Sequence, residues 1–361
     1  MANYISIQPK DNFKIVEYTG NTTARTISDV GFLPALTWIK NRSSASDGNL
    51  FDSTRGAYKS IATNKNAAEY TGSDSVASWV SNGFTLGADT SSGGTVNGSG
   101  GSYIAFNFKG SSTTAPSGST VTLYGSQVNA AMGFGIYKYR CSVVGQYINH
   151  GLGAKPSFIM AKNLNTSVPA GDTATDWACY SSRIESDLTQ CGDFFISINR
   201  TTAKQDNSGT WVDTVPDATK VAVGTDTKIG GSGNTHIMYV FCNKRGMQKA
   251  GSYDGNANAD GNFVYLGFKP AWLLIKNAAA NAGWTMFNSL SQPANLVNKF
   301  LTPDSNEAQQ TDSTHVVDFL SNGFKIRANS SELSGDGSRH IYLAFAEEPV
   351  VSSNGIPGLA R

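Results

Sequence analysis

One arrangement of apolar and polar positions occurs three times along the chain. A glycine and, three residues later, a proline precede an apolar run that ends on Lys-Asn, and the copies span residues 31–41, 153–163 and 267–277. The proline fixes a bend, and the run after it lacks the alternation of a half-exposed strand. Strands covered on both faces have this pattern, so each copy predicts a buried strand that begins at a bend.

A second phrase closes each copy with apolar side chains at alternate positions. The three closing phrases align without a gap, and these positions hold Ile104, Phe106 and Phe108, then Ile237, Tyr239 and Phe241, then Ile341, Leu343 and Phe345. Alternate positions of a strand lie on one face. The intervening residues differ between copies. We therefore expect each closing strand to bury one face in a one-sided core and to leave the other face free to vary.

The two phrases lie at similar distances in all three copies. The span from the proline to the glycine before the closing strand runs from residue 34 to 100, from 156 to 233 and from 270 to 337. Copies one and three also share Ser-Asn-Gly-Phe, at residues 81–84 and 321–324, which copy two lacks. Asn-Gly between apolar positions is typical of a hairpin with a type I′ turn.

These repeats predict an all-β protein of three tandem β-sandwich modules of the jelly-roll or lectin-like kind. The predicted boundaries are 1–110, 134–247 and 248–349 for the modules, 111–133 for a linker rich in Gly, Ser and Thr, and 350–361 for a C-terminal tail. Copies two and three have almost no spacer between them, so we expect these two to pack as a rigid pair.

The composition indicates short strands joined by polar turns, and it disfavours several classes of function. Of the 361 residues 38 are Gly, and only 15% are charged, against about a quarter in typical domains. The net charge of +1 comes without a basic stripe that would neutralise nucleic-acid phosphates. The longest apolar stretches are about five residues, far short of the ~20 that span a bilayer, and the first residues lack the features of a signal peptide. We expect a soluble protein, made in the cytosol, that neither binds nucleic acid nor inserts into a membrane.

The sequence lacks the usual catalytic motifs, such as a nucleophile elbow, a phosphate loop or His-Glu-x-x-His. Asp52 is the most enzyme-like acid, because it ends a predicted strand beside Ser53 and Arg55. Copies two and three carry Ser181 and Asn288 at its position. Since neither residue can perform the proton chemistry of a carboxylate, we interpret Asp52 as a strand-end hydrogen-bonding group. We expect no enzyme activity and no cofactor.

Metal binding and disulfides are also weakly indicated. Residues 254–262 carry oxygen side chains at alternate positions, but Ala259 and Tyr265 stand where an EF-hand loop needs Gly and Glu. We interpret the segment as a polar hairpin loop and expect no metal site. The four cysteines lie in the middle third without a CxxC spacing: Cys141, Cys179, Cys191 and Cys242. Free, buried thiols are the favoured interpretation, and one or two disulfides remain the alternative.

Aromatic residues that recur at equivalent repeat positions are expected to be core. Four tryptophans belong to this group: Trp38, Trp177, Trp272 and Trp284. His236 and His340 stand where copy one has Tyr103, which indicates packing rings rather than catalysts. Trp211 differs, because it follows a polar run that includes Asn207 in the extra length of copy two. A ring on a polar loop can stack on a sugar face, so Asn207 and Trp211 are our candidate ligand-binding residues, with capping of the sandwich edge as the alternative for Trp211.

Four phrases together resemble a repeat module of virion proteins from tailed phages, especially marine phages and cyanophages. They are residues 31–42, 50–56, 81–87 and 100–109, with counterparts in copy three. Such proteins are often tail fibres or other structural proteins of the particle. The modules are also similar to concanavalin-like and laminin-G sandwiches. The resemblance covers residues 13 to about 349 and implies no catalytic residues. Copy two departs from it by lacking the hairpin, which puts a shared ligand site there in doubt.

The function expected from this resemblance is a structural protein on the exterior of a phage particle, located in the virion after synthesis in the host cytoplasm. A tail fibre, capsid fibre or knob would attach to host glycans by weak contacts multiplied by valency. The expected partners are other virion proteins, host surface glycan and further copies of the chain, with a trimer favoured. One alternative is a purely architectural capsid-decoration or tail-wall protein. The other is a glycan-degrading enzyme, which would need two carboxylates facing each other across a groove.

Overall fold

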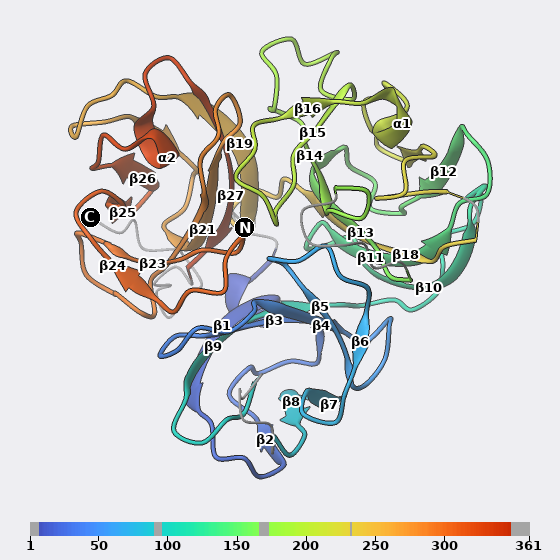
Figure 1. The fold of residues 1–361 in the computed structure, drawn as a ribbon, viewed down its shortest axis with the longest axis horizontal. Helices are drawn as coiled ribbons and strands as arrows, with labels where there is room; N and C mark the ends of the chain where they lie inside the picture. The colour runs from blue at the N-terminus through green and yellow to red at the C-terminus, as the bar shows by residue number, and fades with distance from the viewer. Residues whose placement is uncertain (1–6, 90–95, 166–172, 232, 348–361) are drawn as a thin grey trace, which may run out of the picture.

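The computed structural model describes residues 7–89, 96–165, 173–231 and 233–347. Its elements are nearly all strands in antiparallel sheets, which confirms the all-β prediction. The sheets fall into three groups in chain order, and Figure 1 shows them as three lobes around a common centre. We call these groups module 1 (residues 7–109), module 2 (122–242) and module 3 (248–346).

Modules 1 and 3 have the same sheet topology. Each has a six-stranded sheet, ordered β1-β9-β3-β4-β5-β6 and β19-β27-β21-β22-β23-β24, and a three-stranded sheet, ordered β2-β8-β7 and β20-β26-β25. The elements of module 1 are η1 (Pro9–Asp11), β1 (Phe13–Thr19), β2 (Arg25–Ile27), β3 (Pro34–Asn41), β4 (Asn49–Asp52), β5 (Lys59–Ala62), β6 (Tyr70–Thr71), β7 (Val76–Val80), β8 (Gly83–Leu86) and β9 (Ser102–Lys109). Those of module 3 are β19 (Gln248–Asp254), β20 (Phe263–Tyr265), β21 (Pro270–Asn277), β22 (Trp284–Asn288), β23 (Lys299–Leu301), β24 (Gln310–Thr311), β25 (Val317–Leu320), β26 (Gly323–Ile326), α2 (Ser331–Ser334) and β27 (Arg339–Ala346).

Module 2 keeps the central strands and differs at its edges. Its five-stranded sheet has the order β10-β11-β18-β13-β14. Its elements are β10 (Thr122–Asn129), β11 (Phe134–Arg140), β12 (Gln146–Asn149), β13 (Pro156–Asn163), β14 (Ala178–Ser181), β15 (Phe194–Phe195), β16 (Gln205–Asp206), α1 (Ser208–Trp211), β17 (Lys220–Val223) and β18 (His236–Cys242).

The prediction of a linker over residues 111–133 needs correction, because β10 lies within it. This strand pairs with β11 from Thr122 to Asn129, and Val128 is buried at its end. The Asn129 amide also donates to the Asn12 side chain of module 1 at 3.2 Å. Composition pointed to a linker because Gly and Ser surround the strand, but an antiparallel partner and a buried end stabilise it.

The glycine of the repeated phrase provides its bend. Gly31 and Gly267 have positive φ of 82° and 84°, a conformation that residues with a side chain rarely adopt. In modules 1 and 3 the carbonyl oxygen at the hairpin turn, on Asn82 or Asn322, accepts hydrogen bonds from this glycine and from the residue before it. These hydrogen bonds hold the hairpin turn against the start of the repeated phrase. The buried strand that follows, β3 or β21, is an inner strand of its six-stranded sheet.

The closing strands are buried on both faces, contrary to the expectation of a one-sided core. All but the first and last residues of β9 are buried, and β18 is buried throughout. In module 1 one face, with Tyr103 and Ala105, packs inside the module, while the other face packs in a cluster formed by all three modules. The recurring apolar positions thus belong to the contact between modules, which explains why they vary least.

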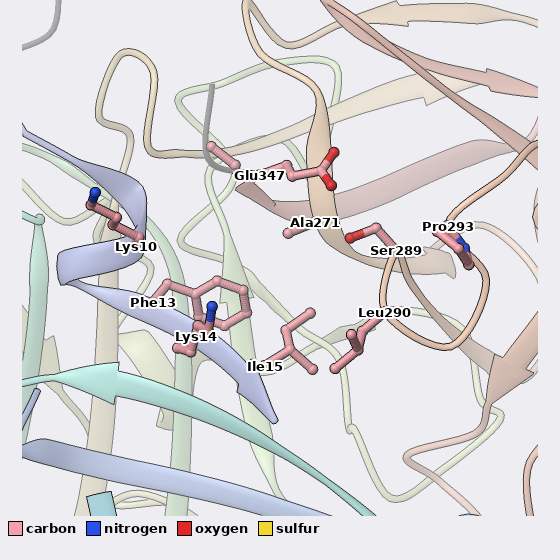
Figure 2. Close-up of a pocket in the computed structure, with 10 residues that line it drawn as sticks. Lys10, Phe13, Lys14, Ile15, Ala271, Ser289, Leu290, Pro293 and Glu347 are labelled. Carbon is pink, nitrogen blue, oxygen red and sulfur yellow. The ribbon is translucent and has the colours of Figure 1, made fainter. Parts of the chain in front are cut away.

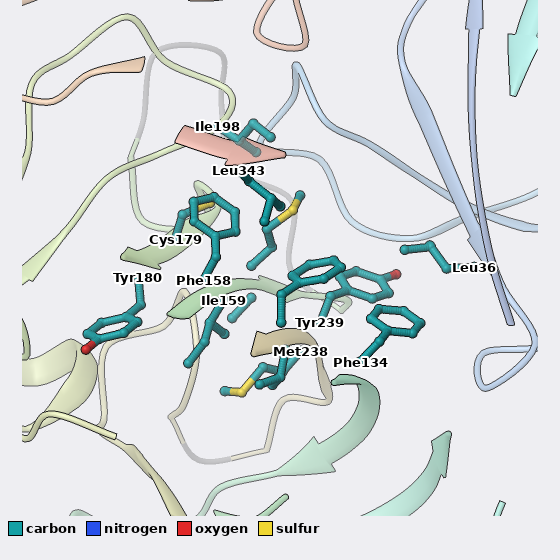
Figure 3. Packing of buried hydrophobic residues seen from close by; sticks show 14 of the residues in the cluster. Leu36, Phe134, Phe158, Ile159, Cys179, Tyr180, Ile198, Met238, Tyr239 and Leu343 are labelled. Atoms are coloured by element: carbon teal, nitrogen blue, oxygen red, sulfur yellow. The ribbon is translucent and has the colours of Figure 1, made fainter. Parts of the chain in front are cut away.

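Three phenylalanines from the closing strands meet at the centre of the molecule. The ring centroids of Phe108, Phe241 and Phe345 lie 5.1 to 5.9 Å apart, and each ring belongs to a different module. Figure 3 draws part of the surrounding cluster, including Leu36 of module 1 and Leu343 of module 3 with residues of module 2. The three modules therefore share one hydrophobic core, and modules 2 and 3 do not form a separate pair.

Candidate functional site

The repeated lysines connect the three modules in a cycle. Each ammonium donates one hydrogen bond to a carbonyl of its own module and one to a carbonyl of a neighbour. The contacts are Lys40 to Ser46 (2.8 Å) and Ser305 (2.8 Å), Lys162 to Thr175 (2.6 Å) and Asn66 (3.2 Å), and Lys276 to Ala282 (2.6 Å) and Thr201 (2.9 Å). Module 1 thus contacts module 3, module 2 contacts module 1, and module 3 contacts module 2.

Backbone hydrogen bonds follow the same cycle. The residue two positions after each lysine accepts from a neighbouring module. The pairs are Gln309 N–H to the Arg42 carbonyl (3.0 Å), Glu69 to Leu164 (2.9 Å) and Lys204 to Ala278 (2.9 Å). Equivalent bonds at all three junctions give the chain a pseudo-threefold arrangement, which is the symmetry of a closed trimer within one polypeptide.

A tryptophan side chain adds a hydrogen bond at two of the three junctions. At the remaining junction, module 1 uses a threonine hydroxyl instead. The Trp177 indole N–H donates to the Ala62 carbonyl at 3.0 Å, and that of Trp284 donates to Ser197 at 2.9 Å. At the equivalent register, module 1 has Gly48, where a Cβ would lie 3.4 Å from the Trp38 indole nitrogen. Module 1 instead donates from the Thr63 hydroxyl to the Pro303 carbonyl at 2.8 Å. The recurrent tryptophans are buried, as the sequence predicted.

Asp52 lies in a buried polar network between modules 1 and 2. Its carboxylate pairs with the Arg55 guanidinium and accepts the Arg55 backbone N–H at 2.8 Å. The Tyr239 hydroxyl of module 2 donates to the same carboxylate at 2.7 Å. Burial, with the charge of Asp52, raises the pKa of Tyr239 well above its ordinary value, so this hydroxyl remains a donor. Asp52 therefore has the strand-end hydrogen-bonding role predicted for it.

Replacing Tyr239 with phenylalanine is expected to lower the free energy of unfolding by about 1–3 kcal/mol, because a buried carboxylate loses a donor. Tyr180→Phe is the matched control. Tyr180 is equally buried, but within the described chain its hydroxyl has no hydrogen-bond partner. Its removal should be neutral or slightly stabilising. Urea denaturation of both variants measures the difference, and equal losses would contradict a role for Tyr239 at the junction.

His236 and His340 are packing rings, as expected. In each module the residue just before the first recurring apolar position of the closing strand stacks on a tyrosine of the adjacent strand. The pairs are Tyr103 on Tyr18, His236 on Tyr139 and His340 on Tyr253, with centroids 5.0 to 5.5 Å apart. Burial lowers the pKa of His236 to about 4. The ring is therefore neutral at physiological pH.

This histidine makes stability depend on pH. Between pH 6.5 and 4 the unfolded chain binds a proton at His236 that the folded chain does not, so stability falls as the pH falls. The expected loss is about 3 kcal/mol. His236→Tyr, which copies Tyr103 of module 1, should flatten this part of the profile. Measuring the free energy of unfolding of both proteins at pH 7 and pH 4 tests this prediction. If the variant lost as much stability as the wild type between these pH values, His236 would not be the source of the pH dependence.

The candidate ligand residues Asn207 and Trp211 have structural roles, which corrects that prediction. Trp211 is fully buried at the end of α1, edge-on to Tyr180, so its ring cannot stack on a sugar. Asn207 caps α1 by accepting the Gly209 N–H at 2.8 Å, and its amide donates to Asp226 at 2.7 Å. The polar loop before Trp211 suggested exposure, but one helical turn directs the ring inward.

All four cysteines are free and buried, in agreement with the favoured interpretation. Burial raises the pKa of Cys179 and Cys242, to about 12 for Cys242, so both remain thiols at physiological pH. Over the described ranges, no group of three or more His, Cys, Asp or Glu side chains is placed to hold a metal ion. Asp260, in the calcium-like loop, pairs instead with Lys325 at 2.9 Å.

Two grooves lie beside the Asn-Gly hairpins of modules 1 and 3. The groove in module 1 has a volume of about 680 Å³ and lies between the hairpin strand β7 and the edge strand β10 of module 2. Trp79 and Leu33 are the largest apolar side chains that line it, and Ser53, Gln127 and Lys109 contribute polar groups. The module 3 groove, of about 410 Å³, contains polar and apolar residues of the equivalent hairpin: Phe319, Leu320, Ser321 and Asn322. The sequence does not predict the module 1 groove, because Gln127 belongs to the segment that its composition assigns to a linker.

A third groove, of about 400 Å³, lies at the junction of modules 3 and 1. Figure 2 shows Lys10 and Lys14 on the module 1 side and Glu347 on the module 3 side. Glu347 is paired with Lys269 at 2.7 Å. Phe13 lines the groove and stacks on Phe345 with centroids 4.7 Å apart, so this groove is the outer edge of the shared core.

Residues 8–349 match the family described as a domain of unknown function, DUF7483, and the chain belongs to this family. The match spans all three modules, so the family unit is the whole closed body rather than one repeat. No curated protein matches the chain. In the part of the chain that the structure describes, no helix has the length and apolar character needed to cross a membrane.

Proposed function

We propose that this protein is a structural component on the exterior of a phage particle, of the tail-fibre, capsid-fibre or knob type, which aids host attachment by weak glycan binding. The phage assignment is supported by the resemblance of the repeated phrases to virion proteins of tailed phages. The observation that carries the attachment role is a closed three-module body with a groove beside each Asn-Gly hairpin.

The module 1 groove has the chemistry of a weak saccharide site. An indole and an aliphatic side chain provide apolar surface for the faces of sugar rings, and Ser53 and Gln127 provide hydroxyl and amide groups. These two side chains already contact each other at 3.2 Å, which holds them at the rim. Lys109 also lines the groove, and its ammonium can donate hydrogen bonds to a ligand there.

Weak sites of this kind become effective through repetition. Two grooves per chain, in one rigid body, are multiplied when several copies share a particle, since linked sites raise the effective concentration of each other. The proposed partners are other virion proteins, further copies of the chain with a trimer favoured, and host surface glycan. No cofactor or enzymatic step belongs to this proposal.

Two experiments test the proposed function. Protein displayed multivalently on beads is applied to a glycan array, and binding to host envelope saccharides is expected. Lys109→Ala should weaken that binding, whereas Lys65→Ala, which removes an exposed lysine paired with Asp47, should not. Absence of binding at high valency would leave only an architectural role. Immunogold labelling of intact particles tests location, and a signal confined to the particle interior would exclude the proposal.

A further inference from the structure

Two aromatic side chains stand exposed on the small sheet of module 3. Strand β20 alternates exposed, buried and exposed, and Phe263 and Tyr265 are 48% and 60% exposed. Val264 between them points into the core of the module. Residues two apart on a strand lie about 7 Å from each other on one face, so the two rings are neighbours on the solvent side.

The register across the small sheet surrounds these rings with small or polar groups. Tyr265 lies opposite Gly323, and Phe263 lies opposite Lys325. The Phe263 ring covers Gly323, since a Cβ built there would lie 3.2 Å from the ring. The Lys249 ammonium donates to the Tyr265 carbonyl at 2.6 Å and lies 5.4 Å from the centre of its ring.

A balanced chain of charges borders the rings. Asp260 contacts both Lys325 at 2.9 Å and Arg327 at 3.3 Å, and Arg327 also contacts Asp318 at 3.4 Å. Within these ion pairs two cations and two anions cancel, and the remaining cation, Lys249, already contacts the Tyr265 carbonyl and ring. Each charged group at the border therefore has a partner within the protein, which favours a neutral ligand over a charged one. Partly exposed ion pairs can still exchange hydrogen bonds with hydroxyl groups.

Module 1 shows that the fold does not require aromatic residues here. By the register of β2 with β8, Thr26 stands where module 3 has Phe263, and Ser28 follows where it has Tyr265. The Thr26 hydroxyl contacts that of Thr85 at 3.1 Å, in place of the ring and lysine. The same sandwich thus forms with small hydroxyl side chains, and the rings of module 3 are an addition to it.

We propose that this solvent face, which we call the aromatic face and define as Phe263, Tyr265, Lys325 and Arg327, binds a neutral saccharide chain. The rings stack on the apolar faces of consecutive sugar units, and the charged border hydrogen-bonds to their hydroxyls. A protein partner fits less well, because two rings offer far less than the ~800 Å² that each side of a stable interface buries. Dry contact would also desolvate the ion pairs. The inference rests on the proposed attachment function and adds a second kind of site to the hairpin grooves.

The test uses affinity electrophoresis of the full chain in gels that contain dextran, xyloglucan or galactomannan, with heparin as the charged comparison. Wild-type protein should be retarded by at least one neutral polysaccharide. The variant Phe263→Thr with Tyr265→Ser, which copies module 1, should lose about 10- to 100-fold in association constant. The reciprocal variant, Thr26→Phe with Ser28→Tyr, should increase retardation by placing a second pair of exposed rings on module 1. Circular dichroism and thermal unfolding confirm that each variant is folded, and Tyr265→Ser alone replaces the double variant if that one unfolds.

The outcomes separate the site from the function. Equal retardation of wild type and the module 1-like variant would overturn the aromatic face while leaving glycan attachment standing. Retardation by heparin alone would overturn the neutral ligand. Failure of the wild-type protein to bind any saccharide, on the array or in gels, would overturn both proposals. A change in oligomeric mass between wild type and the variant, measured by light scattering, would identify the face as a contact between copies and overturn the saccharide assignment.

Discussion

Replacing Phe345 with alanine is expected to lower the free energy of unfolding by about 3–5 kcal/mol, as for other fully buried phenylalanines. Its ring contacts those of Phe108 and Phe241 at the centre of the molecule, so the cavity would open between all three modules. Hydrogen exchange should therefore become faster in the closing strands of every module, and not in β27 alone. Chemical denaturation should still show one transition, because the modules share a core.

Phe324→Ala is the matched control for this prediction. Phe324 is also fully buried, but it packs inside module 3 against Tyr253 and Tyr342. A similar loss of stability is expected from its truncation, with faster exchange confined to module 3. If Phe345→Ala gave the same confined pattern, the shared core would not couple the modules.

Replacing Lys162 with alanine is expected to lower the free energy of unfolding by about 2–4 kcal/mol, because two carbonyls lose its hydrogen bonds and the stem leaves a cavity. The buried Thr175 carbonyl loses the ammonium donor, while the part-buried Asn66 carbonyl keeps a hydrogen bond from the Thr175 hydroxyl at 2.7 Å. One of these carbonyls, on Asn66, belongs to module 1, so the contact between modules 1 and 2 should loosen first. Limited proteolysis and hydrogen exchange of the variant should locate the change at this junction. Lys65→Ala removes an exposed lysine paired with Asp47 and should change stability by less than about 1 kcal/mol. Comparable losses in both variants would contradict a special role for the buried position.

The same lysine adds a second pH dependence. Burial lowers the pKa of Lys162 to about 7, so between pH 7 and about 10 the unfolded chain holds a proton that the folded chain releases. Stability should rise with pH in this window, and Lys162→Ala should lose part of the rise. A neutral amine still has two hydrogens, enough for the two carbonyls that Lys162 contacts.

The sequence was sufficient to predict the repeated strands, because burial on both faces leaves an uninterrupted apolar run. It was insufficient to say what covers each face. The recurring side chains Phe106, Tyr239 and Leu343 were expected inside each module, yet they pack in the core that the modules share. Apolar periodicity reports that a face is buried, but it carries no information on whether the covering surface comes from the same module or another one.

The candidate site was less predictable for a related reason. Trp211 was selected because polar residues precede it, but a single helical turn places its ring in the core. Phe263 and Tyr265 carry no distinguishing signal in the sequence, because their alternation with Val264 is that of any half-buried strand. Only the comparison of Phe263 with Thr26 at the same register shows that module 3 carries an unusual residue there.

The closed cycle of junctions has a consequence for how the protein behaves at low concentration. A ring of three separate subunits falls apart on dilution, because its assembly depends on protomer concentration. Here every junction forms within one polypeptide, so the three-part geometry persists at any dilution. Because the three modules belong to one chain, they need not have identical sequences, as the subunits of a homotrimer must. One part can gain aromatic residues, as at Phe263, while another keeps Thr26, which identical subunits encoded by one sequence could not do.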